Sequence, residues 1–133
     1  MLLNRWKSDQ EVPEFYGIFT ASGEAYKLND TGFVRYTDVS EPCSFLDVVV
    51  LAKRDLYGGK YRVKCGEAMQ HGSIGVIVLE DLSSGEAIWS LVSENSNPFD
   101  QIEVKAGYVL ILSSSGTLFR FCEELQNFTL SVP

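Results

Sequence analysis

The chain has 133 residues, enough for one domain, which we expect to span residues 1–133 and to bury roughly two thirds of the surface that the unfolded chain exposes. Hydrophobic residues make up 45% of the chain and charged residues 22%, which is ordinary for a globular protein and excludes global disorder. The three cysteines, Cys43, Cys65 and Cys122, are widely spaced and form no CxxC pair, so we expect reduced, buried thiols rather than a disulfide framework or a zinc site.

The formal net charge of −7 lies entirely in the second half of the chain. Residues 1–64 hold nine acidic and nine basic residues, whereas residues 65–133 hold nine acidic residues and only two basic ones, Lys105 and Arg120. An acidic field repels nucleic acid and anionic lipid and attracts a basic partner. We therefore expect no nucleic-acid partner and no membrane partner.

The first 14 residues form either a short helix or an irregular arm, with Pro13 fixing its end. They lack the apolar core of about 7–15 residues that marks a signal peptide, and no apolar run of about 20 residues occurs anywhere. We therefore expect a cytoplasmic protein.

From Phe15 onward, short runs rich in β-branched and aromatic residues alternate with glycine-containing turns, which predicts strands. In the first half the predicted strands are 15–20, 25–28 and 33–38. In the second half they are 74–79, 87–92, the alternating segment around Ile102 and Val104, 108–112, 117–122 and 128–132. The run 74–79 is apolar throughout, so it is predicted to be covered on both faces, with Gly85 taking a positive φ in the turn that follows.

The segment from Ser44 to Gly59 has two readings. Ser44 and Asp47 have the spacing of a capping box and Gly58-Gly59 would end a helix, but Val48-Val49-Val50 is an unusual choice for a helix interior. We favour two strands, 46–53 and 60–65, joined by a loop. The bases on these strands are predicted to form a solvated hairpin face rather than a nucleic-acid site: Lys53, Arg54, Lys60, Arg62 and Lys64.

These elements predict an all-β fold, or a β-rich fold with at most one short helix. Short strands joined by glycine turns form an antiparallel β-sandwich or a partly open β-barrel of hairpins.

No catalytic residue, cofactor site or metal site is predicted, and we do not expect an enzyme. His71 is the only histidine and is predicted to lie in a loop. The adjacent acids Glu80 and Asp81 would point to opposite faces of a strand, which is poor geometry for a general acid and base. Trp89 is predicted in the core, with an exposed interface anchor as the alternative, and Phe99 suits either role equally.

Four features of the second half resemble the small cytosolic immunity proteins that accompany bacterial polymorphic and contact-dependent toxins. They are His71-Gly72-Ser73 before the strand 75–79, the strand Ile88-Trp89-Ser90-Leu91, the turn Ser96-Asn97-Pro98-Phe99, and the closing strand 116–121 after a glycine turn. The resemblance implies a non-enzymatic inhibitor that binds one cognate toxin domain, often a basic nuclease, and blocks its active site or substrate groove.

The residues themselves agree with a binding role, because carboxylates on a rigid β scaffold can accept hydrogen bonds from lysine and arginine. The candidate partner-binding residues combine the acids of two turns and the neighbouring strand with two aromatic side chains: Glu80, Asp81, Glu86, Glu94, Asp100, Glu103, Phe99 and Trp89, with Tyr108 as a further aromatic candidate. The alternatives are a small-ligand-binding β-barrel, and a structural or assembly subunit of a secretion or phage apparatus.

Overall fold

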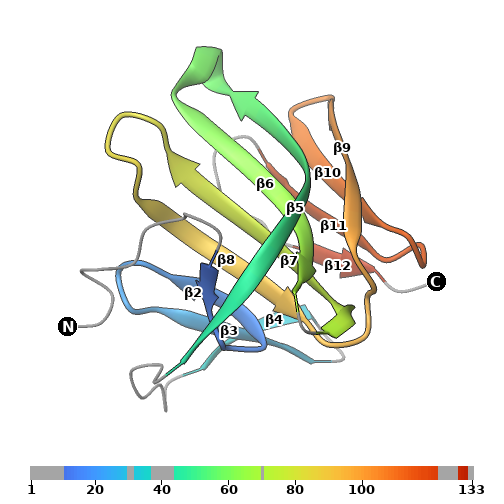
Figure 1. The fold of residues 1–133 in the computed structure, drawn as a ribbon. Coiled ribbons are helices and arrows are strands. Elements are labelled where there is room, and N and C mark those ends of the chain that lie inside the picture. The colour runs from blue at the N-terminus through green and yellow to red at the C-terminus, as the bar shows by residue number, and fades with distance from the viewer. Residues whose placement is uncertain (1–10, 30–31, 37–43, 70, 123–128, 132–133) are drawn as a thin grey trace.

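The computed structural model describes residues 11–29, 32–36, 44–69, 71–122 and 129–131, and its strands form two antiparallel sheets packed as a sandwich (Figure 1). The larger sheet has eight strands in the order β1-β5-β6-β7-β8-β2-β3-β4, and the smaller has four in the order β12-β11-β10-β9. In the described ranges the helical content is a single 3-10 turn, Tyr57–Gly59. The all-β sandwich predicted from the sequence is therefore confirmed.

The strands of the larger sheet are β1 (Glu11–Pro13), β2 (Gly17–Thr20), β3 (Ala25–Asn29), β4 (Gly32–Tyr36), β5 (Phe45–Leu56), β6 (Tyr61–Ala68), β7 (His71–Asp81) and β8 (Ala87–Ser93). Those of the smaller sheet are β9 (Phe99–Lys105), β10 (Tyr108–Ser113), β11 (Leu118–Cys122) and β12 (Thr129–Ser131). Part of the predicted 33–38 strand and of the predicted 128–132 strand lies outside the described residues.

The ambiguous segment after Ser44 is a strand and not a helix, because β5 runs from Phe45 to Leu56 and pairs with β6 from Val48 to Leu56. Both strands are longer than predicted. The three valines at 48–50 explain the outcome, since β-branched side chains lose rotamer freedom in a helix and fit a pleated sheet.

Strand β7 is buried on both faces, as its apolar run predicted. Ile77 and Leu79 face the smaller sheet, where they pack in one core cluster with Trp89 and Phe119. Val76 and Val78 belong to a second cluster on the opposite face, together with side chains from β1 and the start of β5. Figure 1 shows why the second face is covered, because β5 crosses diagonally over the larger sheet.

The bend in β5 depends on a glycine in its neighbour. The pairing of β5 with β6 shifts register between Val50 and Ala52, and at this point the β5 backbone comes so close that a Cβ on Gly66 would collide with the Val49 carbonyl oxygen. Only glycine allows this approach. The bend carries the first half of β5 onto the second core cluster.

Two local predictions differ from the structure. Glu11–Pro13, expected in a helix or an irregular arm, forms the edge strand β1 by pairing with Phe45–Asp47, and the residues before Glu11 lie outside the described part. His71, expected in a loop, is the first residue of β7. The predicted positive φ of Gly85 is confirmed at 73°. No helix in the described ranges is long and apolar enough to cross a membrane.

Candidate functional site

The two acidic turns that the sequence suggested as one binding surface lie at opposite ends of the larger sheet. Each antiparallel strand reverses direction, so the β5–β6 and β7–β8 connections share one end, and the β6–β7 and β8–β9 connections share the other (Figure 1). The turn after Glu80 is at the first end and the turn from Glu94 to Asp100 is at the second. A single surface combining both turns is therefore excluded.

At the first end, basic side chains of the β5–β6 hairpin accompany the acids of the β7–β8 turn. Glu80, one of the candidate partner-binding residues, is only 7% exposed, and its carboxylate lies 3.2 Å from the ammonium group of Lys64. Asp81 accepts hydrogen bonds from the hydroxyl and the N–H of Ser83, at 2.6 and 2.8 Å. These bonds, and more weakly the charge of Lys60, lower the pKa of Asp81.

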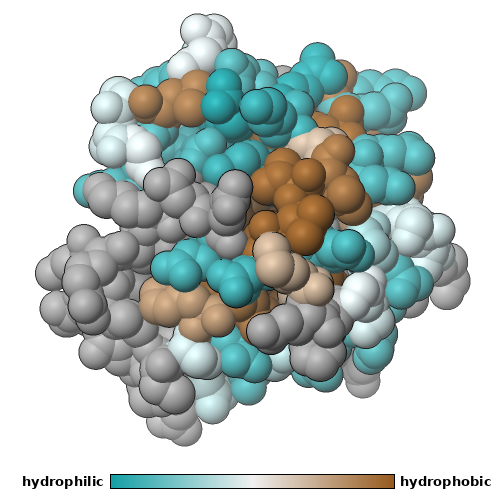
Figure 2. Space-filling model, in the orientation of Figure 1, coloured by the Kyte–Doolittle hydropathy of each residue, from teal (hydrophilic) through white to brown (hydrophobic). Residues whose placement is uncertain are grey.

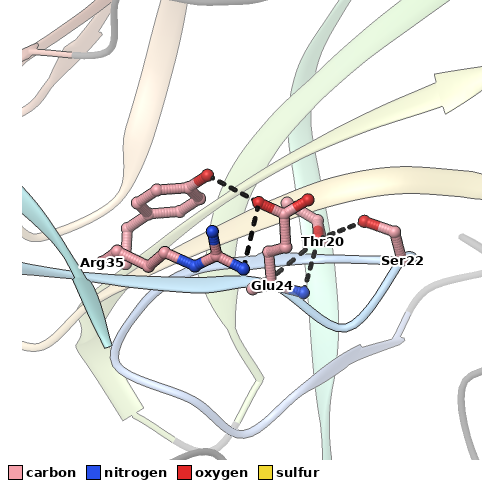
Figure 3. A network of polar contacts seen from close by, with 5 residues as sticks. Thr20, Ser22, Glu24 and Arg35 are labelled. Carbon is pink, nitrogen blue, oxygen red and sulfur yellow. Dashed lines mark hydrogen bonds and ion pairs between the residues drawn. The ribbon is translucent and has the colours of Figure 1, made fainter. Parts of the chain in front are cut away.

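Two further ion pairs belong to this end. Arg62 lies 2.6 Å from Asp55 across the β5–β6 hairpin. In the β2–β3 turn, Glu24 accepts a hydrogen bond from Tyr26 at 3.0 Å and lies 3.9 Å from Arg35 (Figure 3). We call this region the mixed end, since bases and acids alternate there: Lys53, Arg54, Lys60, Arg62 and Lys64 with Asp55, Glu80, Asp81 and Glu86.

The opposite end brings together five chain segments that each carry an acidic residue. Backbone hydrogen bonds tie these segments together, from Glu14 to Ser44, from Met69 to Asp47, from Asn97 to Ser73 and from Ser114 to Pro98, at 2.8 to 3.1 Å. We call this region the acidic end, defined by Glu14, Asp47, Glu67, Glu94 and Asp100. Lys27 is the base that lines the pocket beside Glu14 and Glu94.

Sequence reasoning found two members of the acidic end, Glu94 and Asp100, and missed the other three. Glu14 and Asp47 belong to the first half of the chain, whose charges cancel, and Glu67 follows the basic residues of β6. A count of charges along the chain groups these three acids with bases that are close in sequence but lie at the other end of the sheet. Glu86 and Glu103 are exposed but lie outside the acidic end.

Two of the three aromatic candidates, Trp89 and Phe99, are buried. Trp89 is 2% exposed and Phe99 is fully buried, both in the core cluster between the sheets. The Trp89 ring meets Phe119 and Phe121 nearly edge-on, with centroids 5.8 and 5.1 Å away. The prediction of Trp89 in the core is therefore confirmed, and Phe99, which suited either role, lies in the core as well, so neither ring offers surface to a partner in this conformation. Tyr108 is 36% exposed, with the Arg120 guanidinium over its ring.

An open pocket of about 680 Å³ lies at the acidic end and is lined by the larger sheet, the segments next to it and the β10–β11 turn. The segment before β2 supplies Glu14 through Gly17, the end of β8 and its turn supply residues 91–96, and Lys27, Phe33 and Thr117 complete the wall. Phe33 and Leu91 provide apolar surface, and Glu14 and Glu94 provide carboxylates. No sequence motif marked this pocket, because its walls come from positions about 100 residues apart.

The Tyr16 side chain lies near both carboxylates of the pocket. Its hydroxyl donates a hydrogen bond to Glu14 at 3.4 Å, and its side chain remains 36% exposed. Burial raises the pKa of Tyr16, and the negative charges of Glu14 and Glu94 raise it further. Both carboxylates therefore influence the pKa of the same tyrosine.

The cysteines and the possible metal-binding residues form no further candidate site within the described part of the chain. Cys65 is a buried free thiol whose pKa is raised to about 12 by burial and by the charge of Asp100, and Cys122 is half-buried. Cys43 lies outside the described residues. The described histidines, cysteines and acids include no group of three or more placed to hold a metal ion.

An apolar patch lies over the middle of β5 (Figure 2). Val50 and Leu51, at the register shift of this strand, are 36% and 48% exposed. Scattered exposed apolar side chains are normal on soluble domains, and this pair is small compared with an interface core.

No protein-family model matches the chain, and none of the curated proteins or solved structures matches it.

Proposed function

We propose that this protein is a non-enzymatic binding protein whose acidic end engages a basic domain of a protein partner, in the manner of an immunity protein that neutralises its cognate toxin. The observation that supports this proposal is that five segments, each with an acidic residue, lie together at one end of the sandwich. The resemblance of the second half of the chain to toxin immunity proteins supports the same role.

The physical basis is electrostatic complementarity on a rigid scaffold. Carboxylates accept short, charge-assisted hydrogen bonds from arginine and lysine, which are the groups that a nuclease uses to hold phosphate. The turn that bears Glu94 is fixed by the hydrogen bond from Asn97 to β7 and by that from Ser115 to the Ser96 carbonyl, at 3.0 and 2.6 Å. Little conformational entropy is then lost when a partner binds.

The mixed end is a poorer candidate for the same contact. Lys64 and Arg62 already form ion pairs with carboxylates, and Asp81 already accepts a hydrogen bond from Ser83 of the β7–β8 turn. A basic partner approaching this end would meet bases as well as acids, so the net attraction would be small.

The test uses two charge-reversal variants with the same change in net charge. E67K/D100K alters the acidic end, and E86K/E103K alters exposed acids outside it. Each variant and the wild type would be used to capture partners from the native cell, and the captured domain would be expressed alone and with this protein. We expect the domain to be toxic alone and harmless with the wild type.

Association of the purified pair would then be followed at low and high salt. We expect E67K/D100K to slow association by roughly tenfold or more at low salt and to flatten the salt dependence, because it removes electrostatic steering. E86K/E103K should associate nearly as fast as the wild type. Equal effects of the two variants, or toxicity that the wild type does not relieve, would overturn the proposal.

The pocket favours binding of a small organic ligand as a second candidate function. Its volume of about 680 Å³ lies in the usual range for ligand sites, about 300–1,000 Å³. In that case a ligand from a small-molecule library should raise the melting temperature of the wild type, and that rise should be lost when the exposed Tyr16 at the pocket wall is replaced by Ala.

A further inference from the structure

The pocket at the acidic end combines aromatic surface with two carboxylates, between the larger sheet and the β10–β11 turn. Its walls include the rings of Phe15, Tyr16 and Phe33 and the carboxylates of Glu14 and Glu94. Arginine suits such a wall well, because its planar guanidinium can bond a carboxylate at its edge while its face lies on a ring.

One cationic side chain, that of Lys27, already lies against aromatic rings at this pocket, which shows that the rings can contact a cation. The Lys27 ammonium lies 4.3 Å from the Tyr36 centroid and 5.7 Å from that of Phe15. Of the charged side chains that line the pocket, Lys27 is basic and Glu14 and Glu94 are acidic, so the lining keeps one negative charge. An incoming cation would restore neutrality.

The two carboxylates are held from separate directions. Glu14 accepts a hydrogen bond from the Ser44 hydroxyl at 2.8 Å, which ties it to the start of β5. Glu94 belongs to the turn whose next residues pack against Gly75, where a Cβ would lie 2.5 Å from the Asn97 carbonyl oxygen. This rigidity leaves the pocket open in the absence of a partner.

We infer that this pocket receives an arginine side chain from the basic partner, with its guanidinium against the exposed Tyr16 ring and between Glu14 and Glu94. The inference rests on the proposed function and names the group that the acidic end recognises. With about 680 Å³, the pocket has room for the tip of a loop that carries the arginine.

The probe is a short blocked peptide, acetyl-Gly-Arg-Gly-amide, titrated into protein with isotope-labelled tyrosines. We expect the Tyr16 ring signals to shift, and the matching citrulline peptide, which is neutral and nearly isosteric, to leave them unchanged. The E14Q/E94Q variant should bind the arginine peptide about tenfold or more weakly, because it loses both charge-assisted contacts. The matched control E86Q/E103Q carries the same charge change outside the pocket and should bind like the wild type.

A second variant tests the charge balance rather than the fold. Replacing Lys27 by Met removes the competing cation, so K27M should bind the arginine peptide more tightly than the wild type. Equal binding of the citrulline peptide, unchanged affinity in E14Q/E94Q, or weaker binding by K27M would overturn the inference. If E67K/D100K loses the partner while E14Q/E94Q keeps it, the pocket assignment fails and the proposed function stands.

Discussion

Lys64 and Glu80 form a largely desolvated ion pair on adjacent strands. Their side chains are 16% and 9% exposed, and the ammonium nitrogen lies 3.2 Å from a carboxylate oxygen. Charges removed from water in this way are tolerated when they are paired, and removal of one partner is strongly destabilising. The pair therefore stabilises the fold mainly by preventing a buried, uncompensated charge.

We predict that K64M lowers the free energy of unfolding by about 3 kcal/mol. Urea denaturation followed by tryptophan fluorescence would measure the change. The control K53M removes an exposed lysine from the same hairpin and should change stability by about 0.5 kcal/mol or less. A similar, small effect of both substitutions would show that Glu80 is stabilised by something other than this pair.

This pairing explains why sequence reasoning misjudged Glu80. In the sequence Glu80 opens an acidic stretch that contains no base, and a turn residue of this kind is normally solvated. The register of β6 against β7 sets Arg62 opposite Glu80 and Lys64 two residues away, and it extends β7 through Asp81. Register between strands depends on packing, which local patterns do not report.

At the level of elements, most strands could be predicted from the sequence. The location of the candidate site, however, depends on which end of the larger sheet each turn occupies. Apolar runs such as Ile74–Leu79 and glycine turns such as that at Gly85 gave the hairpins. The three-residue β1 strand and the crossing of β5 over the sheet could not be found, because they depend on contacts between distant segments. Assigning each turn to its end required the strand order.

The β8–β9 turn is the element that presents Glu94, and a glycine in β7 allows it to pack closely. A Cβ at Gly75 would lie 2.5 Å from the Asn97 carbonyl oxygen and 2.7 Å from the Phe99 ring. We predict that G75A destabilises the protein by about 1–3 kcal/mol, because backbone and a buried ring must move. Thermal or urea unfolding would measure it.

A matched control lies three residues away in the same strand. At Gly72 the nearest atom to an added Cβ is a Glu67 side-chain oxygen at 3.5 Å, which is ordinary contact. G72A should therefore change stability by about 0.5 kcal/mol or less. If G75A were as mild as G72A, the turn would not be held rigidly against β7.

For the molecule as a whole, charge is distributed unequally between the two ends of the larger sheet. The sequence correctly signalled a surplus of acid, but it located the surplus in the second half of the chain. Folding brings the bases of β5 and β6 to the acids of the β7–β8 turn, and it brings Glu14, Asp47 and Glu67 to the turn that bears Glu94. Opposite charges meet at one end and like charges meet at the other.

Like charges gathered at one end oppose folding, so a binding role for the acidic end should be visible as a local cost in stability. We predict that E67Q/E94Q raises the free energy of unfolding at pH 7 and low salt by roughly 0.5–1 kcal/mol, the scale of exposed charge interactions. The gain should disappear at about 1 M salt, where the screening length is about 3 Å. The matched variant E86Q/E103Q changes the net charge equally and should gain less, since its sites lie outside the acidic end. Equal gains would mean that total charge, rather than its concentration at one end, sets the repulsion.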